Sequence, residues 1–481
     1  MGKDYNEVAH SNKGRLHLLI PATSSNPDLC KLLLSAQILN YPTPVLINYG
    51  DVEDTEHAYK QHLAKVEGIL NYLEQLDTSS EYDEDLVLIL DGYDVHLQLR
   101  PDVLIKRYYA SNEAANVRAR IDYGDALFER YDLRQTILFG PDKLCWPVDY
   151  GRPACWAVPD TPLANYAFGP QTDRSFDANM PRWLNSGTIM GPVQDVKELF
   201  NATLEEIHTK YETDSDQFYF ANIWGAQEYA RIARKPELLE HRKDIRQPEE
   251  QSLPKSNLTR TEPEPSEKQT EYHIGIDYES SAFQTLAFYK QFLTFMRPAD
   301  AWTQFQHQTP IGVAGPARPA YDLTLPADIH ESQAPFQALK LANPDAVERW
   351  PSWSDVELLY NTVTGVIPVL IHFTGEKKFR AVWWQKMARA RELHLASEPP
   401  SSDPLSPTPI DGLIWYSAVA DDASEVISRG IGGAWSDTGG WHSWKGLCGA
   451  HEGGFFAVPN EDYYHAPPTP FEEKPTERRG V

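Results

Sequence analysis

The sequence has few cysteines, no long apolar segment and a shortage of positive charge. Its 481 residues include 4 cysteines, and 44 Lys and Arg stand against 69 Asp and Glu, which gives a formal net charge of -25. No apolar run approaches the roughly 20 residues that a membrane helix needs, so no membrane segment is predicted. The charge argues against nucleic acid as a partner, because Lys and Arg supply most of the affinity for its phosphate backbone. An anionic ligand would therefore need a local source of positive charge, such as a metal ion or a helix N-terminus.

Several common binding motifs are also missing. Neither GxGxxG nor GxxxxGK[ST] follows the first predicted strand, which excludes the usual dinucleotide and P-loop sites. Cys30, Cys145, Cys155 and Cys448 show no CxxC spacing, and HExxH is absent, so a structural zinc site and a zinc hydrolase are both disfavoured. Cys145 and Cys155 are close enough to form a disulfide in an oxidising compartment, although they could equally be two buried thiols.

The first ninety residues alternate between strands and helices. Apolar runs and helical spacing predict, in chain order, a strand at 15–22, a helix at 29–39, a strand at 43–51, a helix at 59–76 and a strand at 86–90. Asn26 or Asp28 would cap the first helix. This order predicts an α/β fold of Rossmann-like type, with a mostly parallel central sheet flanked by helices.

Composition divides the chain into regions. We expect one α/β domain over residues 15–390, interrupted at 243–270 by a mobile insertion that is poor in aromatic and β-branched residues. A Gly- and Trp-rich extension at 410–465 would pack on this domain. The tail at 466–481 would be loose.

The run LVLILDGYDV at 86–95 places two carboxylates after a buried strand. In open α/β sheets, ligands bind outside the carboxyl ends of strands, where this DxxD motif would place Asp91 and Asp94. A metal ion could bind there. Asp is also common in ordinary turns after strands, where it accepts hydrogen bonds from the nearby backbone, and the spacing alone does not separate the two interpretations.

A second strand, within VIPVLIHFTGEKK, ends in His372 and is followed by Gly375, Lys377 and Lys378. A lone histidine after a strand is more often structural than a ligand. Together with two aspartates, however, it makes a ligand set with open positions that suits a divalent ion such as Mn²⁺. The ion and the lysines could then hold the charge of a diphosphate leaving group.

These motifs, in their order along residues 15–380, resemble the glycosyltransferase domain of the procollagen lysyl hydroxylase and glycosyltransferase enzymes. The likeness is carried by LLIPATSSNPDLCKLLLSAQILNYPTPVLINYGD, KVEGILNYL, LVLILDGYDV, KLCWP, RWLNSGTIMG, DSDQFYF, IGIDYESSAFQ and VLIHFTGEKK. That family has a GT-A fold and uses a nucleotide sugar with Mn²⁺. The resemblance implies a metal-dependent transferase that moves glucose or galactose from a UDP-sugar to an acceptor hydroxyl on a glycan or glycoprotein.

The resemblance also implies roles for individual residues. The ligands of Mn²⁺, or of Mg²⁺ in its place, would be Asp91, Asp94 and His372. Residues on the side of the nucleotide and its phosphates would be Thr23, Tyr49, Lys65, Gly375, Lys377 and Lys378, with Tyr49 as a candidate for stacking on uracil. Residues near the donor sugar and acceptor would be Trp146, Asn185, Asp214 and Asp216. The alternative for Trp146 is plain core packing, and for the last two acids it is a favourable interaction with a helix dipole.

Two features of the carboxyl region bear on function. Trp435, Trp441, His442 and Trp444 either line an acceptor site or pack as a lid or buttress. Nothing beyond residue 381 resembles the hydroxylase domain of the collagen-modifying enzymes, so a stand-alone transferase is expected.

The subcellular location is a hypothesis. Asn201 and Asn257 lie in glycosylation sequons, which favours the secretory pathway, in the Golgi or endoplasmic reticulum lumen. The polar amino end MGKDYNEVAHSNKGR then implies that an anchor or signal is absent from this chain.

Two other functions compete with the transferase. One is a catalytically inactive carbohydrate-binding protein with a GT-A-like fold. The other is a sugar-1-phosphate nucleotidyltransferase, which would need a glycine-rich, basic loop after the first strand, and PATSSNPD supplies neither.

Overall fold

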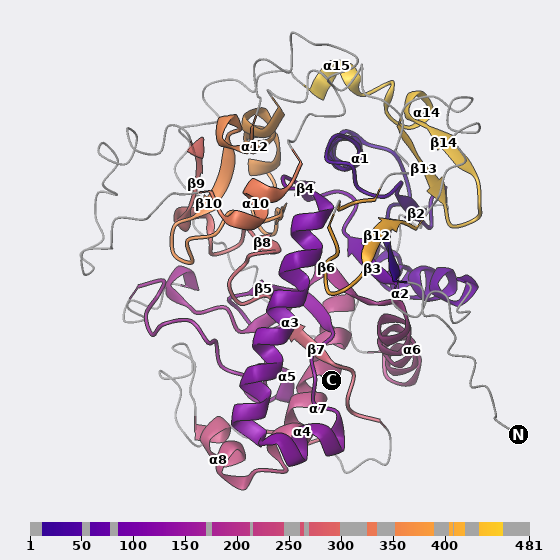
Figure 1. Cartoon of the computed structure of the whole chain (residues 1–481). Helices are drawn as coiled ribbons and strands as arrows, with labels where there is room; N and C mark the ends of the chain where they lie inside the picture. The colour runs from indigo at the N-terminus through magenta and orange to yellow at the C-terminus, as the bar shows by residue number, and fades with distance from the viewer. Residues whose placement is uncertain are drawn as a thin grey trace, which may run out of the picture.

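The computed structural model describes residues 12–50, 58–76, 85–169, 176–211, 215–244, 260–263, 269–298, 325–333, 352–388, 404–406, 408–418 and 432–455. Over these residues the chain forms an α/β fold, with a central sheet and helices packed around it (Figure 1). The predicted α/β class is confirmed.

The central sheet is mixed. Its strands are β1 (Lys13–Pro21), β2 (Val45–Ile47), β3 (Leu86–Leu90), β5 (Ile137–Asp142), β6 (Trp183–Pro192), β7 (Ile274–Ile276), β12 (Ile414–Ser417), β13 (Gly433–Ser436) and β14 (Trp441–Ser443). They follow the order β14-β13-β2-β1-β3-β6-β5-β7, and β12 pairs with β1 beside this path. β1, β2 and β3 are parallel as predicted, but β6 runs antiparallel to both β3 and β5.

Helices cover both faces of this sheet because its inner strands are apolar on both sides. The longer helices are α1 (Pro27–Ile38), α2 (Ala58–Gln75), α3 (Pro101–Tyr123), α6 (Val193–Thr209) and α7 (Asp216–Ile232). Leu18 and Ile20 of β1 belong to a core shared with α1 and α3, whereas Leu19 belongs to a core shared with α2, α6 and α7. α3 lies in front of the sheet in Figure 1.

Local chemistry explains where the first elements begin and end. The side chain of Asn26 accepts hydrogen bonds from the backbone of Asp28 and Leu29, so Asn26 is the N-cap of α1. β2 is shorter than the predicted strand, because Asn48 and Gly50 have φ values of 60° and 89°. Such left-handed residues end an extended strand.

Two small sheets bring distant segments beside the central one. One has the order β4-β11-β8, formed by β4 (Val95–Leu97), β11 (Leu370–His372) and β8 (Phe283–Thr285). The other pairs β9 (Leu293–Met296) with β10 (Leu358–Asn361). In the first sheet His372 lies opposite Val95, the residue directly after Asp94. The pairing therefore places the predicted histidine next to the predicted carboxylates.

The C-terminal extension adds strands to the central sheet over its described residues. β12 pairs with β1, and β13 pairs with β2, both in parallel. A disulfide joins Cys448, at the end of α14 (Trp444–Cys448), to Cys30 in α1. Trp444 is 8% exposed and contributes to the core of this face, so it acts as a buttress.

The second disulfide, between Cys145 and Cys155, connects the loop after β5 to α5 (Pro153–Trp156). Of the two alternatives that the sequence left open for this pair, the structure has the disulfide. Most of the predicted insertion, at 245–259 and 264–268, and the tail at 466–481 lie outside the described residues. The described remainder of the insertion includes the end of α8 (Pro236–Asp244) and Thr261, whose backbone N–H donates to Gly151.

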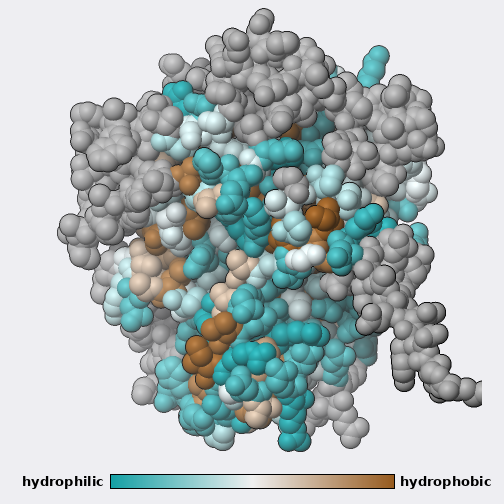
Figure 2. Space-filling view, viewed as in Figure 1, coloured by the Kyte–Doolittle hydropathy of each residue, from teal (hydrophilic) through white to brown (hydrophobic). Residues whose placement is uncertain are grey.

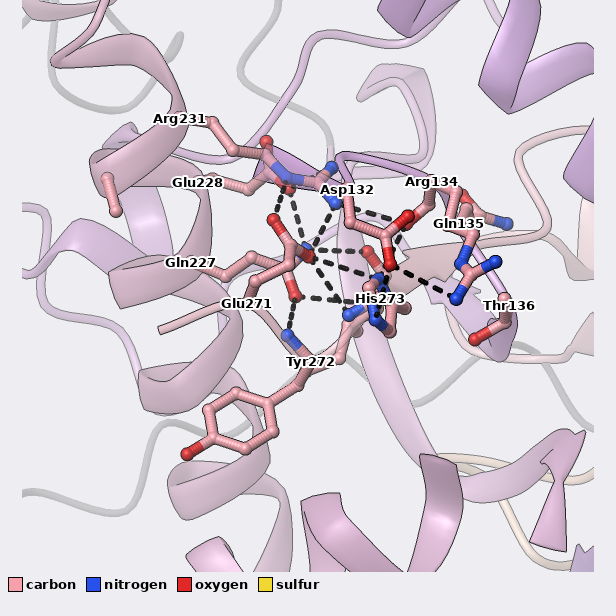
Figure 3. Close-up of polar contacts among 12 residues, drawn as sticks. Asp132, Arg134, Gln135, Thr136, Gln227, Glu228, Arg231, Glu271, Tyr272 and His273 are labelled. Carbon is pink, nitrogen blue, oxygen red and sulfur yellow. Dashed lines mark hydrogen bonds and ion pairs between the residues drawn. The ribbon is translucent and has the colours of Figure 1, made fainter. Parts of the chain in front are cut away.

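A polar cluster fixes α7 to the amino end of β7 (Figure 3). The guanidinium of Arg231 donates two hydrogen bonds of 2.7 Å to the carboxylate of Glu271 and one of 3.1 Å to Glu228. The side chain of Gln227 bonds to both the N–H and the carbonyl of Ile274. These side chains thus satisfy backbone groups that the short strand β7 leaves unpaired.

The face of the molecule in Figure 2 is mainly hydrophilic, with an apolar area over α3. Val117 and Ile121 on that helix are 46% and 76% exposed. In the described part of the chain, no helix is long and apolar enough to cross a lipid bilayer.

Candidate metal centre

Asp91, Asp94 and His372 come together at the carboxyl end of β3. One potential ligand atom from each lies within 4.8 Å of the others, and the Nε2 atom of His372 is 3.3 Å from Asp94 and 3.8 Å from Asp91. The backbone N–H of Phe373 donates to the carbonyl of Asp94 at 2.7 Å, which fixes the end of β11 against the DxxD turn. The predicted juxtaposition of these three side chains is therefore present.

Two glycines leave room for this arrangement. A Cβ atom on Gly92, inside the DxxD turn, would lie 2.5 Å from the carbonyl oxygen of Pro21. A Cβ atom on Gly187 of β6 would lie 2.1 Å from the His372 ring and 2.7 Å from a carboxylate oxygen of Asp91. Any larger residue at position 187 would have to displace these ligands.

The donor set fits a divalent cation. Two carboxylates and one imidazole leave coordination positions for water or a ligand, and Mn²⁺ accepts all three donor types. His372 and Asp91 lie directly over Gly187, and glycine is the only residue type that leaves that space free of a side chain. This cluster could hold a metal ion.

Lys65 of α2 links the metal centre to α7. Its ammonium group lies 2.7 Å from Asp91 and 2.9 Å from Asp216, and it donates to the carbonyl of Ser186 at 3.1 Å. Burial alone would lower the pKa of Lys65, but the charges of Asp216 and Asp91 raise it above its usual value. The amine stays charged and offsets two of the carboxylates in this region.

A second lysine contacts the site from the loop after β11. Lys377 forms an ion pair with Asp94. Burial would raise the pKa of Asp94, but His372 and Lys377 together lower it below its ordinary range. Lys378 instead pairs with Glu376 at 3.2 Å. Gly375 allows the chain to turn there, with a φ of 72° that favours glycine.

The LNSG segment supports the other side of the centre. Asn185 accepts a hydrogen bond from the N–H of Gly187 and donates to Gln217 at 3.3 Å. Ser186 donates to Asp216, which is 6% exposed at the start of α7. Asp216 is thus held between Lys65 and Ser186, and Asp214 lies outside the described residues.

Asp142 is a residue of this region that the sequence analysis missed. It ends β5, is 8% exposed, and interacts with Asn185. Burial raises the pKa of Asp142 to about 6, although the backbone N–H groups of Lys143 and Leu144 partly offset this. An aspartate at the end of an apolar strand was the available signal, the same one that identified Asp91.

Three further candidates are Thr23, Tyr49 and Trp146. The carbonyl of Thr23 accepts a hydrogen bond from Gly50, and the ring of Tyr49 lies 4.7 Å from that of His442. Trp146 is 50% exposed, so it is not packed in the core, and it precedes a cis proline.

No protein-family model matches the chain, and no curated protein matches it.

Proposed function

We propose that the protein is a metal-dependent glycosyltransferase that transfers a hexose, glucose or galactose, from a UDP-sugar to an acceptor hydroxyl on a glycan or glycoprotein. The observation that carries the proposal is the convergence of Asp91, Asp94 and His372 within 4.8 Å at the end of a buried parallel strand. The proposal includes a GT-A arrangement of the α/β fold and Mn²⁺, or Mg²⁺, as the ion held by these residues.

The site has the charges that such a transfer needs. In the reaction, the bond between the sugar C1 and the diphosphate oxygen breaks, C1 bonds to the acceptor oxygen, and the acceptor proton is released. When bound, a divalent ion neutralises charge on the departing diphosphate. Lys377, which contacts Asp94 and is itself 49% exposed, can reach the same phosphates. Asp142, Asn185 and the buried Asp216 offer polar groups to sugar hydroxyls on the other side.

The competing function is a catalytically inactive carbohydrate-binding protein of the same fold. It would need no intact ligand set, so the presence of all three ligands in one place favours the enzyme. Trp146 suits either function, because sugars stack on exposed tryptophan faces.

The proposal places the protein in the lumen of the secretory pathway. Two disulfides, Cys30–Cys448 and Cys145–Cys155, support this, because disulfides persist in oxidising compartments and are rare in the cytosol.

UDP release tests the proposal directly. The intact protein is incubated with UDP-glucose and with UDP-galactose, with Mn²⁺ and with chelator, beside Asp94→Ala and Asp125→Ala. Asp125 is a matched control, since its side chain is 83% exposed on α4 (Asp125–Tyr131). We expect Mn²⁺-dependent release from one donor, which Asp94→Ala abolishes and Asp125→Ala keeps.

Calorimetry with UDP separates the two functions if no donor is turned over. UDP binding that requires Mn²⁺ and Asp94 would indicate a transferase that lacks its acceptor. A protein that binds no UDP with Mn²⁺ is not a UDP-sugar transferase.

A further inference from the structure

The C-terminal hairpin of β13 and β14 reaches the loop that follows β2. β13 pairs with β2, and the N–H of Asp437 donates to the carbonyl of Leu46 at 3.0 Å. The carboxylate of Asp437 in turn accepts a hydrogen bond of 2.8 Å from the N–H of Asn48. The two segments, almost 400 residues apart in sequence, are therefore held in register at the carboxyl end of β2.

This register sets two aromatic rings against each other. The rings of Tyr49 and His442 are 4.7 Å apart at an interplanar angle of 61°. Both side chains are partly exposed. Tyr49 comes from the β2 loop and His442 from β14, so the ring pair exists only while the hairpin is docked.

The ring pair lies on the same edge of the sheet as the metal centre. Tyr93, inside the DxxD turn, forms hydrogen bonds of 3.1 Å through its hydroxyl with the N–H and the carbonyl of Ser24. Ser24 follows β1, and the adjacent Thr23 accepts a hydrogen bond from Gly50 in the β2 loop. A continuous set of contacts thus runs from the metal ligands through the β1 loop to Tyr49.

The order of strands separates two sides of the metal centre. Its carboxylates follow β3, and β6 and β5 on one side carry Asn185 and Asp142, polar groups that suit sugar hydroxyls. On the other side of β3, past β1, Tyr49 follows β2 and His442 lies in β14. A diphosphate held at β3 has two ends, and the side with aromatic rings suits the flat, apolar face of a base.

We propose that His442, together with Tyr49, forms the binding surface for the nucleobase of the donor, so that the C-terminal extension is part of the nucleotide site. This inference rests on the proposed function. It gives His442 a role in nucleotide binding, where the sequence suggested either an acceptor site or a lid.

Calorimetry with two probes tests this role. UDP and inorganic pyrophosphate are each titrated with Mn²⁺ into the intact protein, His442→Ala, His442→Phe and His451→Ala. Pyrophosphate reports the metal and phosphate contacts alone, because it has no base. His451 lies in the same extension but beyond α14, and it is the matched control.

We expect His442→Ala to weaken UDP binding about tenfold, as the loss of one aromatic contact to a base does, and to leave pyrophosphate binding unchanged. His442→Phe keeps a ring and should retain most of the affinity for UDP. His451→Ala should match the intact protein with both probes.

Two results would overturn the inference while the proposed function stands. One is unchanged UDP affinity in His442→Ala. The other is an equal loss for UDP and pyrophosphate, which would show that the hairpin supports the site only structurally. If the intact protein binds neither probe, the proposed function fails as well.

Discussion

Because Gly187 has no side chain, His372 and Asp91 can lie directly over its backbone. Gly187→Ala would put a methyl group into the His372 ring and the Asp91 carboxylate, which must then move apart. We expect Mn²⁺ affinity to fall about 10- to 100-fold, the size of effect seen when ligand orientation is disturbed. Isothermal titration with MnCl₂ measures it.

Gly191→Ala provides the control on the same strand. Its added Cβ would lie 3.1 Å from Ile137 and Val196, in the apolar core and away from the ligands. Mn²⁺ affinity should be unchanged in this variant, even if its stability falls slightly. Equal losses in the two variants would contradict the specific role of Gly187.

Asp142 links stability to pH. Burial raises the pKa of this carboxyl from an ordinary 3.8 to about 6, so folding favours its protonated form. Relative to ionised Asp142, the protonated carboxyl stabilises the folded protein. This contribution to the free energy of unfolding is fully present below about pH 4 and is lost as the pH rises through about 6, which amounts to a loss of about 3 kcal/mol. Asp142→Asn removes the ionisable group and should therefore gain stability relative to the intact protein as the pH rises.

Urea unfolding at pH 5 and pH 7.5 tests the predicted direction of the change in stability with pH. The difference in the free energy of unfolding between Asp142→Asn and the intact protein should shift in favour of the variant at the higher pH. Asp125→Asn, at an exposed position, should show no such shift. If this difference in the free energy of unfolding does not change with pH, ionisation of Asp142 does not destabilise the folded protein.

At the scale of secondary-structure elements, α7 and β7 depend on Arg231. Glu228 is 2% exposed and has Arg231 as its charged partner in the cluster of Figure 3. Arg231→Met would remove the ion-pair partner of this buried carboxylate, and breaking a buried ion pair typically costs 3–5 kcal/mol. We expect a loss of about that size in urea unfolding at neutral pH.

A second substitution tests the cause of that loss. Glu228→Gln in the Arg231→Met background removes the unpaired charge, so it should restore part of the stability. No recovery in the double variant would mean that the contacts of Arg231 with Glu271 carry the effect instead.

At the scale of the whole molecule, the Cys30–Cys448 disulfide closes a loop of 418 residues. Long loops gain the most from cross-linking, and we expect Cys30→Ser with Cys448→Ser to lower the free energy of unfolding by about 2–5 kcal/mol. The Cys145–Cys155 bridge spans only 10 residues, so the corresponding pair of substitutions should cost less. Unfolding in urea ranks the two variants, and the reverse order would contradict this account.

Short sequence patterns predicted those elements that depend on neighbouring residues alone. The strand at 86–90, the N-cap Asn26 and the position of the DxxD turn follow from apolar runs and capping residues. His372 could be paired with the aspartates because both segments end buried strands. The same logic would have found Asp142, which lies after β5.

Long-range pairing was beyond the sequence. Nothing in GGAWS at 432–436 specifies that it pairs with β2, or that β6 runs antiparallel between two strands. Strand partners and directions depend on the packing of the complete chain, and an isolated cysteine such as Cys30 gives no indication of its partner.

The pairing of β12 and β13 with the first two strands has a consequence during synthesis. On one edge, residues 13–16 of β1 and residues 45–46 of β2 meet their strand partners only when 414–417 and 435–436 have been made. At ordinary translation speeds these partners leave the ribosome tens of seconds later. For that time the nascent chain carries strand edges without their native neighbours, and such edges invite pairing with other chains. A holding chaperone at this stage would protect the amino half until the last strands arrive.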